Sequence, residues 1–147
     1  MKIISHRGNL NGRKANEENH PEYLRNALKA GFNVEVDVWF VEGKLLLGHD
    51  KPLYEINERF LTDERMWCHV KNLSALERLL LNKKINCFWH ENDNYALTSK
   101  GQIWTHKNNK INKNCIIMSN SVSINKLECF GICTDFPVKY QKLLKLV

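Results

Sequence analysis

Short runs of apolar residues, separated by polar and turn-forming segments, recur along the whole chain. Runs of this length are typical of β-strands, because an amphipathic helix needs a longer segment with a period of about 3.6 residues. Most runs are continuously apolar, as in a buried strand, whereas residues 32–40 alternate between apolar and acidic positions. The strands that this pattern predicts span residues 3–5, 32–40, 44–48, 66–70, 85–89, 95–98, 102–105, 115–118 and 130–134.

Three other segments have the spacing of helices. Pro21 is favoured in a first helical turn, and apolar residues then recur at helical spacing until a glycine ends the segment. Ser74 is predicted to cap a second helix with a stripe of leucines, and a terminal helix is predicted over residues 138–146. Residues 9–19 and 52–63 are predicted to be loops, the second with a short helical turn.

Ionisable residues stand where several predicted strands end. His6 and Arg7 follow the first strand, and His49 and Asp50 follow the strand over residues 44–48. Because the ligand sites of α/β sheets lie at the carboxyl ends of the strands, we expect these residues to meet at one edge. Arginine offers a planar fork for phosphate oxygens, and histidine can move a proton near neutral pH. Two histidines beside a cation could serve as the acid and base of phosphodiester cleavage.

Glu35 and Asp37 occupy one face of the alternating strand over residues 32–40, and valines occupy the other face. Two carboxylates are costly on a face that closes over an apolar core, but a cation beside them removes this cost. Their hard oxygen atoms are the ligands that Mg²⁺ and Ca²⁺ prefer. The pattern therefore predicts a divalent-cation site, although the same alternation is also typical of an exposed strand face.

The composition is that of an ordinary globular protein, with 147 residues of which 43% are hydrophobic and 26% charged. We expect one domain over residues 1–147, because no internal repeat and no linker rich in proline, glycine or serine divides the chain. The sequence contains no signal-peptide core and no apolar run long enough for a transmembrane segment, so we expect a cytoplasmic protein. The five cysteines form no C-x-x-C pair and are predicted to be reduced thiols.

Positive charge is concentrated in one segment of the chain. The net charge is +6, and residues 94–127 contain lysines but neither aspartate nor glutamate. Such a segment favours an anionic partner through long-range attraction, or is simply a solvated basic face. No recognised nucleic-acid-binding module accompanies the charge, so we expect no stable nucleic-acid partner. The lysines of this segment are Lys100, Lys107, Lys110, Lys113 and Lys126.

The order and spacing of the ionisable residues resemble the glycerophosphodiester phosphodiesterase family, which belongs to the phospholipase-C-like phosphodiesterases built on a TIM barrel. The family pattern is H-R-G near the amino terminus, then E-N, E-x-D-V, G, H-D and a late T-D-x-P. The resemblance is specific over residues 3–53, weak in the middle of the chain, and returns at residues 131–137. The matching residues are His6-Arg7-Gly8, Glu18-Asn19, Glu35-Val36-Asp37-Val38, Gly43, His49-Asp50 and Thr134-Asp135-Phe136-Pro137.

This resemblance implies a role for each catalytic and metal-binding position. His6 and His49 are expected to be the general acid and base. Glu35 and Asp37 are expected to bind one divalent cation, with Mg²⁺ or Ca²⁺ as the usual ions of the family. Glu18 is expected at the edge of the site, either near the metal or hydrogen-bonded to the catalytic groups.

One departure from the family pattern concerns the third metal ligand. The third strand of the family carries E-x-K, whereas the matching residues here are His69-Val70-Lys71. The resemblance implies that Arg7 and Lys71 bind the substrate phosphate, while His69 replaces a metal-binding glutamate. Imidazole suits Mn²⁺ or Zn²⁺ better than Ca²⁺. Either His69 or Glu91, one strand later, is therefore expected as the third protein ligand.

A second departure is the short loop that follows His49-Asp50, where family members carry a long insertion. We therefore expect an open, shallow site that takes a small anionic phosphodiester. The resemblance implies an α/β fold, namely a compact, pared-down TIM-barrel-like (β/α) barrel with several helices shortened or missing. It also implies a metal-dependent phosphodiester hydrolase, and the alternative is a degenerate phosphate- or anion-binding protein on the same fold.

Overall fold

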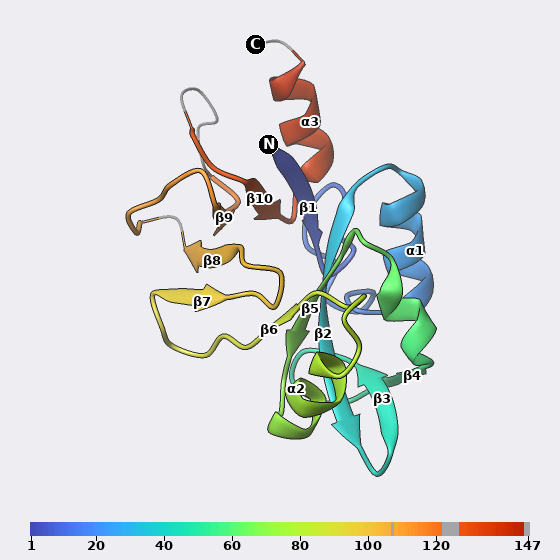
Figure 1. Ribbon diagram of the computed structural model, residues 1–147. Helices are drawn as coiled ribbons and strands as arrows, with labels where there is room; N and C mark the ends of the chain where they lie inside the picture. Colours follow the sequence, from blue (N-terminus) through green and yellow to red (C-terminus); the bar gives the residue numbers. More distant parts are fainter. Residues whose placement is uncertain (107, 122–126, 146–147) are drawn as a thin grey trace.

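The computed structural model describes residues 1–106, 108–121 and 127–145, which form a curled mixed β-sheet with three short helices (Figure 1). Each predicted strand is present, and β4 is an additional strand within a segment predicted to be a loop. The strands are β1 (Lys2–His6), β2 (Asn33–Val41), β3 (Lys44–Leu47), β4 (Tyr54–Ile56), β5 (Met66–Val70), β6 (Cys87–Phe88), β7 (Tyr95–Leu97), β8 (Ile103–His106), β9 (Cys115–Met118) and β10 (Gly131–Thr134). The helices are α1 (Pro21–Lys29), α2 (Leu73–Leu80) and α3 (Pro137–Leu144), and a 3₁₀ helix spans Glu58–Thr62.

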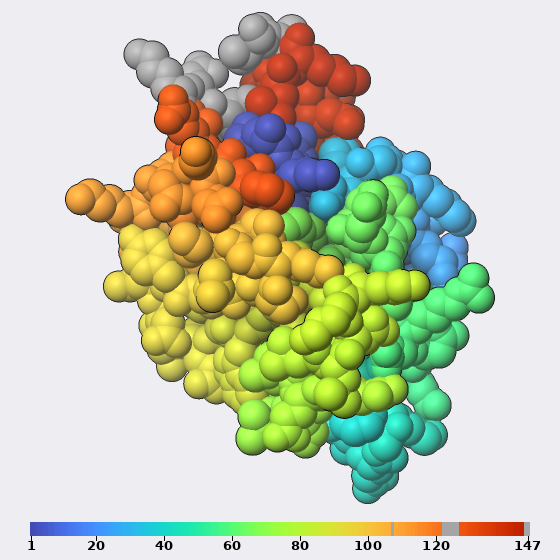
Figure 2. Space-filling view, viewed as in Figure 1, coloured from blue at the N-terminus to red at the C-terminus, as the bar shows by residue number. Residues whose placement is uncertain are grey.

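Parallel strands make up the centre of the sheet, in the spatial order β6-β5-β2-β1-β10-β9-β8. The hairpin β3–β4 extends one part of β2, and β7 runs antiparallel to β8. β1 lies between β2 and β10, so segments from the two ends of the chain meet in the middle of the sheet. Figure 2 shows this arrangement, with the blue amino-terminal segment packed between light-blue and orange-red segments. The carboxyl ends of strands distant in sequence therefore share one edge.

The expected TIM-like barrel is wrong, because the sheet is a curled half-barrel in which strands and helices do not alternate. In the described part of the chain α-helices follow only β1, β5 and β10, and hairpins, loops or the 3₁₀ helix connect the other strands. Helical crossovers between parallel strands need about a dozen residues or more. Only residues 107–114 separate β8 from β9, so this connection is too short for a helical crossover. The sheet rather than a ring of helices therefore dominates the fold.

The two faces of β2 carry different chemistry, as the alternation in its sequence predicts. Val34, Val36 and Val38 are fully buried in the apolar core that also contains side chains of α1 and α2. Because successive side chains of a strand point to opposite faces, Glu35 and Asp37 project from the other face. This second face bears a smaller apolar group and the candidate site. The members of the smaller group are Ile4, Trp67, Phe88, Ala96, Trp104, Ile116 and Cys133.

Helix α2 begins before its predicted cap, because Asn72 rather than Ser74 is the N-cap residue. The side chain of Asn72 accepts a hydrogen bond from the amide of Ala75 at 3.1 Å. It also accepts one from the amide of Phe40 at 3.2 Å and donates one to the Phe40 carbonyl at 2.9 Å. The same side chain therefore starts the helix and ties it to β2.

The structure also bears on what the sequence predicts for the cysteines, for membrane-spanning segments, for the terminal helix and for the basic segment. All five cysteines are free, as predicted, and Cys129 is half-buried while the other four are buried. Within the described residues none of the helices has the length and apolar character that a membrane span requires. The predicted helix end at residue 146 lies outside the described residues, as do Lys107 and Lys126. The other lysines of the basic segment are exposed.

Candidate functional site

A cavity of about 430 Å³ at the carboxyl ends of the parallel strands gathers most of the residues that the sequence singles out. Its wall also carries His90 and His106, to which the sequence analysis assigns no role. Five of the six histidines of the chain therefore line a single cavity, a concentration typical of proton-transfer or metal sites. The lining residues are His6, Arg7, Glu35, His49, His69, Lys71, His90, Glu91, Trp104, His106 and Met118.

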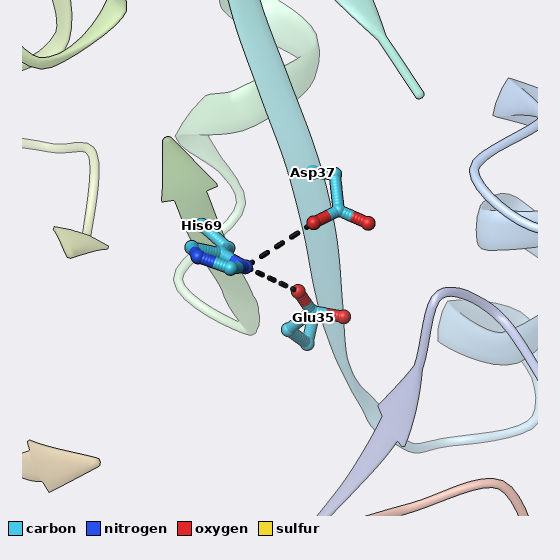
Figure 3. Close-up of side chains that lie close together, drawn as sticks. All are labelled: Glu35, Asp37 and His69. Carbon is cyan, nitrogen blue, oxygen red and sulfur yellow. Dashed lines mark ion pairs between the residues drawn. The ribbon is translucent and has the colours of Figure 1, made fainter. Parts of the chain in front are cut away.

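Glu35 and His69 line this cavity, and Asp37 lies beside them below its surface; the three are named here the carboxylate–imidazole cluster (Figure 3). The acids come from β2 and the imidazole from β5, where His69 is paired in register with Asp37. Nδ1 of His69 lies 3.2 Å from Oδ1 of Asp37 and 3.7 Å from Oε1 of Glu35. One ligand atom of each residue lies within 4.8 Å of the other two, so one cation could contact all three. Glu91 lines the cavity but does not belong to this cluster of described residues.

The ring of His69 is oriented so that Nδ1 faces the two acids. Nε2 lies 2.9 Å from the carbonyl oxygen of His90, and because a carbonyl only accepts, Nε2 carries the hydrogen. In the neutral ring Nδ1 then directs a lone pair at two carboxylates. A cation among the three groups, or a proton on Nδ1, removes the resulting repulsion. Metal-binding histidines usually donate their other N–H to a carbonyl or carboxylate, so this orientation fits a metal ligand.

Asp37 is fully buried and is held by side chains from three segments. Asn19 donates a hydrogen bond to Oδ2 and accepts one from the Asp37 amide, both at 2.9 Å. Nε of Arg7 lies 2.9 Å from Oδ2, and Nζ of Lys71 lies 3.7 Å from Oδ1. Oδ1 is buried but makes no hydrogen bond of acceptable angle. A buried acceptor without a donor is rare, and one that faces His69 fits an oxygen ligand of a cation.

Arg7 is paired with buried carboxylates. Its φ of 52° lies in the left-handed region, which is uncommon for a residue other than glycine. Nη1 lies 3.2 Å from Oε2 of Glu18, and Nε contacts Asp37. Glu18 also accepts a hydrogen bond from Asn9 at 2.9 Å and lies outside the carboxylate–imidazole cluster. The structure therefore places Glu18 beside Arg7, hydrogen-bonded, rather than among the three clustered residues.

The two clustered acids have pKa values that shift in opposite directions. Burial and the neighbouring charge of Asp37 raise the pKa of Glu35. Burial also opposes ionisation of Asp37, but its interaction with His69 and the charge of Arg7 outweigh burial and lower its pKa. The pKa values move apart because two adjacent buried carboxylates cannot both ionise cheaply. A divalent cation would supply the missing charge, and the mixed oxygen and nitrogen donors suit Mn²⁺ or Zn²⁺ as well as Mg²⁺.

His6 has a carboxylate near each of its ring nitrogens. Nδ1 lies 2.7 Å from Oδ1 of Asp135, and Nε2 lies 3.8 Å from Oε2 of Glu35. Burial acts to lower the pKa of His6, but the hydrogen bond with Asp135 and the charge of Glu35 outweigh it and raise the pKa. Burial likewise opposes ionisation of Asp135, yet the hydrogen bond and charge of His6 bring its pKa down to about 2. Asn9 and Asn120 also donate hydrogen bonds to Asp135, at 2.9 and 2.7 Å, so the pair is held in place.

His49 reaches the same cavity from the connection between β3 and β4. Its Nδ1 lies 2.7 Å from Oδ1 of Asp50. Gly48 has a φ of 148°, and a Cβ atom there would lie 2.1 Å from the carbonyl oxygen of Lys51. The indole of Trp39 donates a hydrogen bond to the Gly48 carbonyl at 2.6 Å. A glycine is therefore needed for the turn that presents His49.

Several polar residues of the site acquire a role only in the structure. Asn19 and Asp135 stand in motifs that the sequence analysis matched, but their contacts with Asp37 and His6 could not be read from the motifs. His90 and His106 stand where predicted strands end, which is the same signal that marked His6. Asn120 has no sequence signal, because it is one of many asparagines in polar loops.

No protein-family model matches the chain, and comparisons with curated proteins and with solved structures likewise give no match. The interpretation of the cavity therefore depends on its residues and their geometry. The sequence motifs described above remain a resemblance to a family.

Proposed function

We propose that this protein hydrolyses phosphodiesters with one divalent cation and two histidines, as its glycerophosphodiester phosphodiesterase motifs imply. The observation that carries the proposal is that His6, His49 and Lys71 line one cavity together with Glu35 and His69 of the carboxylate–imidazole cluster. The proposal depends on these residues and not on a barrel fold. Because the cavity is open and positively charged side chains line it, a small anionic phosphodiester is the proposed substrate.

Glu35, Asp37 and His69 are the proposed cation ligands. Oδ1 of Asp37, which is buried and accepts no hydrogen bond, and the direction of Nδ1 in His69 support this assignment. When bound, the cation would neutralise a non-bridging phosphate oxygen and lower the pKa of the attacking hydroxyl. Mg²⁺ and Ca²⁺ suit the two carboxylates, and the imidazole of His69 adds Mn²⁺ and Zn²⁺ to the proposed ions.

His6 and His49 are the proposed proton-transfer groups. Each ring contacts a carboxylate through Nδ1, which therefore carries a hydrogen and leaves Nε2 for proton transfer. Two carboxylates stabilise the protonated ring of His6, so we assign to it the proton that goes to the leaving alcohol. His49 then takes the proton of the attacking water as the bond from phosphorus to the leaving oxygen breaks. Asp135 and Asp50 act as positioning residues.

Lys71 is the proposed contact for the substrate phosphate. Its side chain is mostly buried and lines the cavity beside the cluster, with Nζ 3.7 Å from Asp37. The guanidinium of Arg7 is already paired with Asp37 and Glu18. We therefore assign two roles to Arg7. It pairs with the acids of the site, and its charge adds positive potential where the phosphate would bind.

A phosphodiester panel with controlled metal content tests this proposal. Bis-p-nitrophenyl phosphate and several glycerophosphodiesters would be assayed in EDTA and after Mg²⁺, Ca²⁺, Mn²⁺ or Zn²⁺ is added back. We expect turnover only with metal, and a loss of about 100-fold to 10,000-fold in kcat for His6→Ala and for His49→Ala. Glu35→Gln should abolish metal-dependent turnover. His20→Asn is the matched control, because His20 lies outside the cavity.

An anion-binding protein without turnover is the second candidate function. It is favoured by one observation, namely that Arg7 and Lys71 already pair with Asp37, so the cluster has cationic partners of its own. In that case phosphate or a phosphodiester would bind equally well in EDTA, and no metal would give turnover. Turnover that needs a metal and both histidines would exclude this candidate.

A further inference from the structure

We propose that His90 and His106 form a second metal site, which takes transition-metal ions such as Zn²⁺, Co²⁺ or Cu²⁺ and not Mg²⁺. Both side chains line the cavity, but neither takes part in the reaction proposed above. The second site uses no residue of the carboxylate–imidazole cluster. The proposal of a second site is therefore independent of the proposed phosphodiesterase activity.

The two rings approach one another through their nitrogen atoms. Nε2 of His90 lies 2.9 Å from Nε2 of His106, with ring centroids 5.0 Å apart and planes inclined by 36°. Two imidazole nitrogens that each bind one ion at about 2.0–2.1 Å lie roughly 2.9–3.4 Å apart, for ligand angles between square and tetrahedral. The observed separation falls at the lower end of this range. Rotation of both rings away from the line that joins the two nitrogens would direct both lone pairs at one ion.

A hydrogen bond between the two rings is the arrangement that such an ion would replace. In it one Nε2 carries the hydrogen and the other accepts it, so on metal binding the donor ring must change tautomer and carry its hydrogen on Nδ1 instead. Nδ1 of His90 is buried and makes no hydrogen bond, so the ring is tied only through Nε2 in the part of the chain that the structure describes. The hydrogen bond thus holds the two Nε2 atoms at chelating distance.

Two strands fix the backbone of the pair, and carboxylates line the cavity next to it. His90 follows β6 and His106 ends β8, so two strands of the sheet fix the positions of their backbones. Both histidines also line a neighbouring cavity of about 400 Å³ together with Glu91 and Asp93. These exposed acids, or water, can supply the remaining ligands, because a four-coordinate site needs only part of its ligands from histidine.

Ligand chemistry distinguishes the second site from the cluster. Mg²⁺ prefers oxygen ligands, so the two carboxylates of the cluster suit it and an imidazole pair does not. Zn²⁺ accepts both sets of ligands. The sites are neighbours, since Nε2 of His69 contacts the His90 carbonyl and the two rings lie 6.5 Å apart. We expect the wild-type chain to bind two Zn²⁺ ions but one Mg²⁺ ion.

Zinc stoichiometry tests the second site. Bound zinc would be counted by equilibrium dialysis and elemental analysis on the full chain without a histidine tag. His90→Asn and His106→Asn are each expected to bind one Zn²⁺ fewer than the wild type. His20→Asn is expected to keep the wild-type count, because His20 lies outside both cavities and asparagine can replace it as the N-cap of α1. Circular dichroism would establish that each variant is folded.

Asp37→Asn separates this inference from the proposed function. If Asp37→Asn keeps the wild-type zinc count while His106→Asn loses one ion, the cluster fails as a cation site and the second site stands. If His90→Asn and His106→Asn both keep the wild-type count, the second site is overturned. His106 is exposed, so its replacement leaves the core intact and the count interpretable.

Discussion

In three histidines of the cavity, the hydrogen-bond partner of one ring nitrogen determines which nitrogen carries the hydrogen. The other nitrogen is then the one that can accept a proton or bind a cation. In His6 and His49 a carboxylate contacts Nδ1, so in the neutral ring Nδ1 carries the hydrogen and Nε2 keeps a lone pair. In His69 a backbone carbonyl contacts Nε2, so Nδ1 faces the acids. A hydrogen-bond partner fixes the tautomer of an imidazole, and the tautomer fixes which nitrogen can act as a base or a ligand.

The buried pair of His6 and Asp135 is expected to stabilise the fold more than the exposed pair of His49 and Asp50. Asp135→Asn should lower the free energy of unfolding by about 1–2 kcal/mol at pH 6, because a pKa lowered from 3.8 to about 2 favours the folded state. Asp50→Asn removes a contact of the same length, 2.7 Å, but should change the free energy little, because solvent screens it. Urea unfolding of both variants measures the contrast.

The pH dependence of this contrast follows from the two pKa shifts. The pKa of Asp135 is lowered on folding, so its contribution is present above about pH 4 and is lost as the pH falls toward 2. The pKa of His6 is raised, so its contribution is present below 6.5 and is lost as the pH rises through its folded value. The loss in the free energy of unfolding caused by Asp135→Asn should therefore be greatest between about pH 4 and pH 6.5. Equal unfolding energies for wild type and Asp135→Asn at pH 6 would contradict the expectation.

The residue types near the predicted strand ends predicted much of the site. They could not predict which residues distant in sequence contact one another. His6, Arg7, Glu35 and His49 were singled out from the sequence and share the cavity. The contact of His6 with Asp135 joins residues 129 positions apart, so no local pattern contains it. The sequence could not show which of His69 and Glu91 lies nearer the acids, and pairing of β5 with β2 places His69 beside Glu35 and Asp37.

At the scale of elements, β2 organises the site because it pairs with three other strands. β1 and β5 lie parallel to its first part, and β3 runs antiparallel to its second part. Pairing with β5 puts His69 in register opposite Asp37. The alternation of β2 predicted which face carries the acids, since its period is local. It could not predict β5 as the neighbour, because strand pairing depends on contacts across the sheet.

The N-cap of α2 gives a test at this scale. Asn72→Ala should lower the free energy of unfolding by about 1–2 kcal/mol, because it removes the cap of the helix and the two hydrogen bonds to Phe40. Ser74→Ala is the matched control and should cost less than about 0.5 kcal/mol, because Ser74 is exposed within the helix. Thermal or urea unfolding measures both. A larger loss for Ser74→Ala would show that the cap was assigned to the wrong residue.

At the scale of the whole molecule, the lengths of the connections decide the shape of the sheet. The first βα unit and its strand-end residues are compatible with an alternating barrel, which is why a TIM-like barrel was expected. Beyond residue 81 the connections are short and polar, and α3 is the one further helix among the described residues. Helices α1 and α2 therefore cover only part of the sheet, which is a curled half-barrel without a complete ring of helices.

Amide hydrogen exchange tests this arrangement of the sheet. Amides of β1, β2 and β10 should exchange about 100-fold more slowly, or slower still, than those of β4 and β7, because the first three strands are paired on both sides. β4 and β7 lie at the edges of the strand order and open without disrupting the centre. Peptide-resolved mass spectrometry measures these rates. Protection of β7 equal to that of β2 would mean that β7 is not an edge strand.

The sequence by itself determined the strands, the two faces of β2 and the kinds of chemistry available, because each depends on residues close together in the chain. The tertiary structure decided which strands are neighbours, which nitrogen each histidine presents, and how charge is shared among buried acids. These features depend on groups brought together from distant positions and removed from water, where burial and pairing alter hydrogen bonding and pKa. Local periodicity carries no information about such partners.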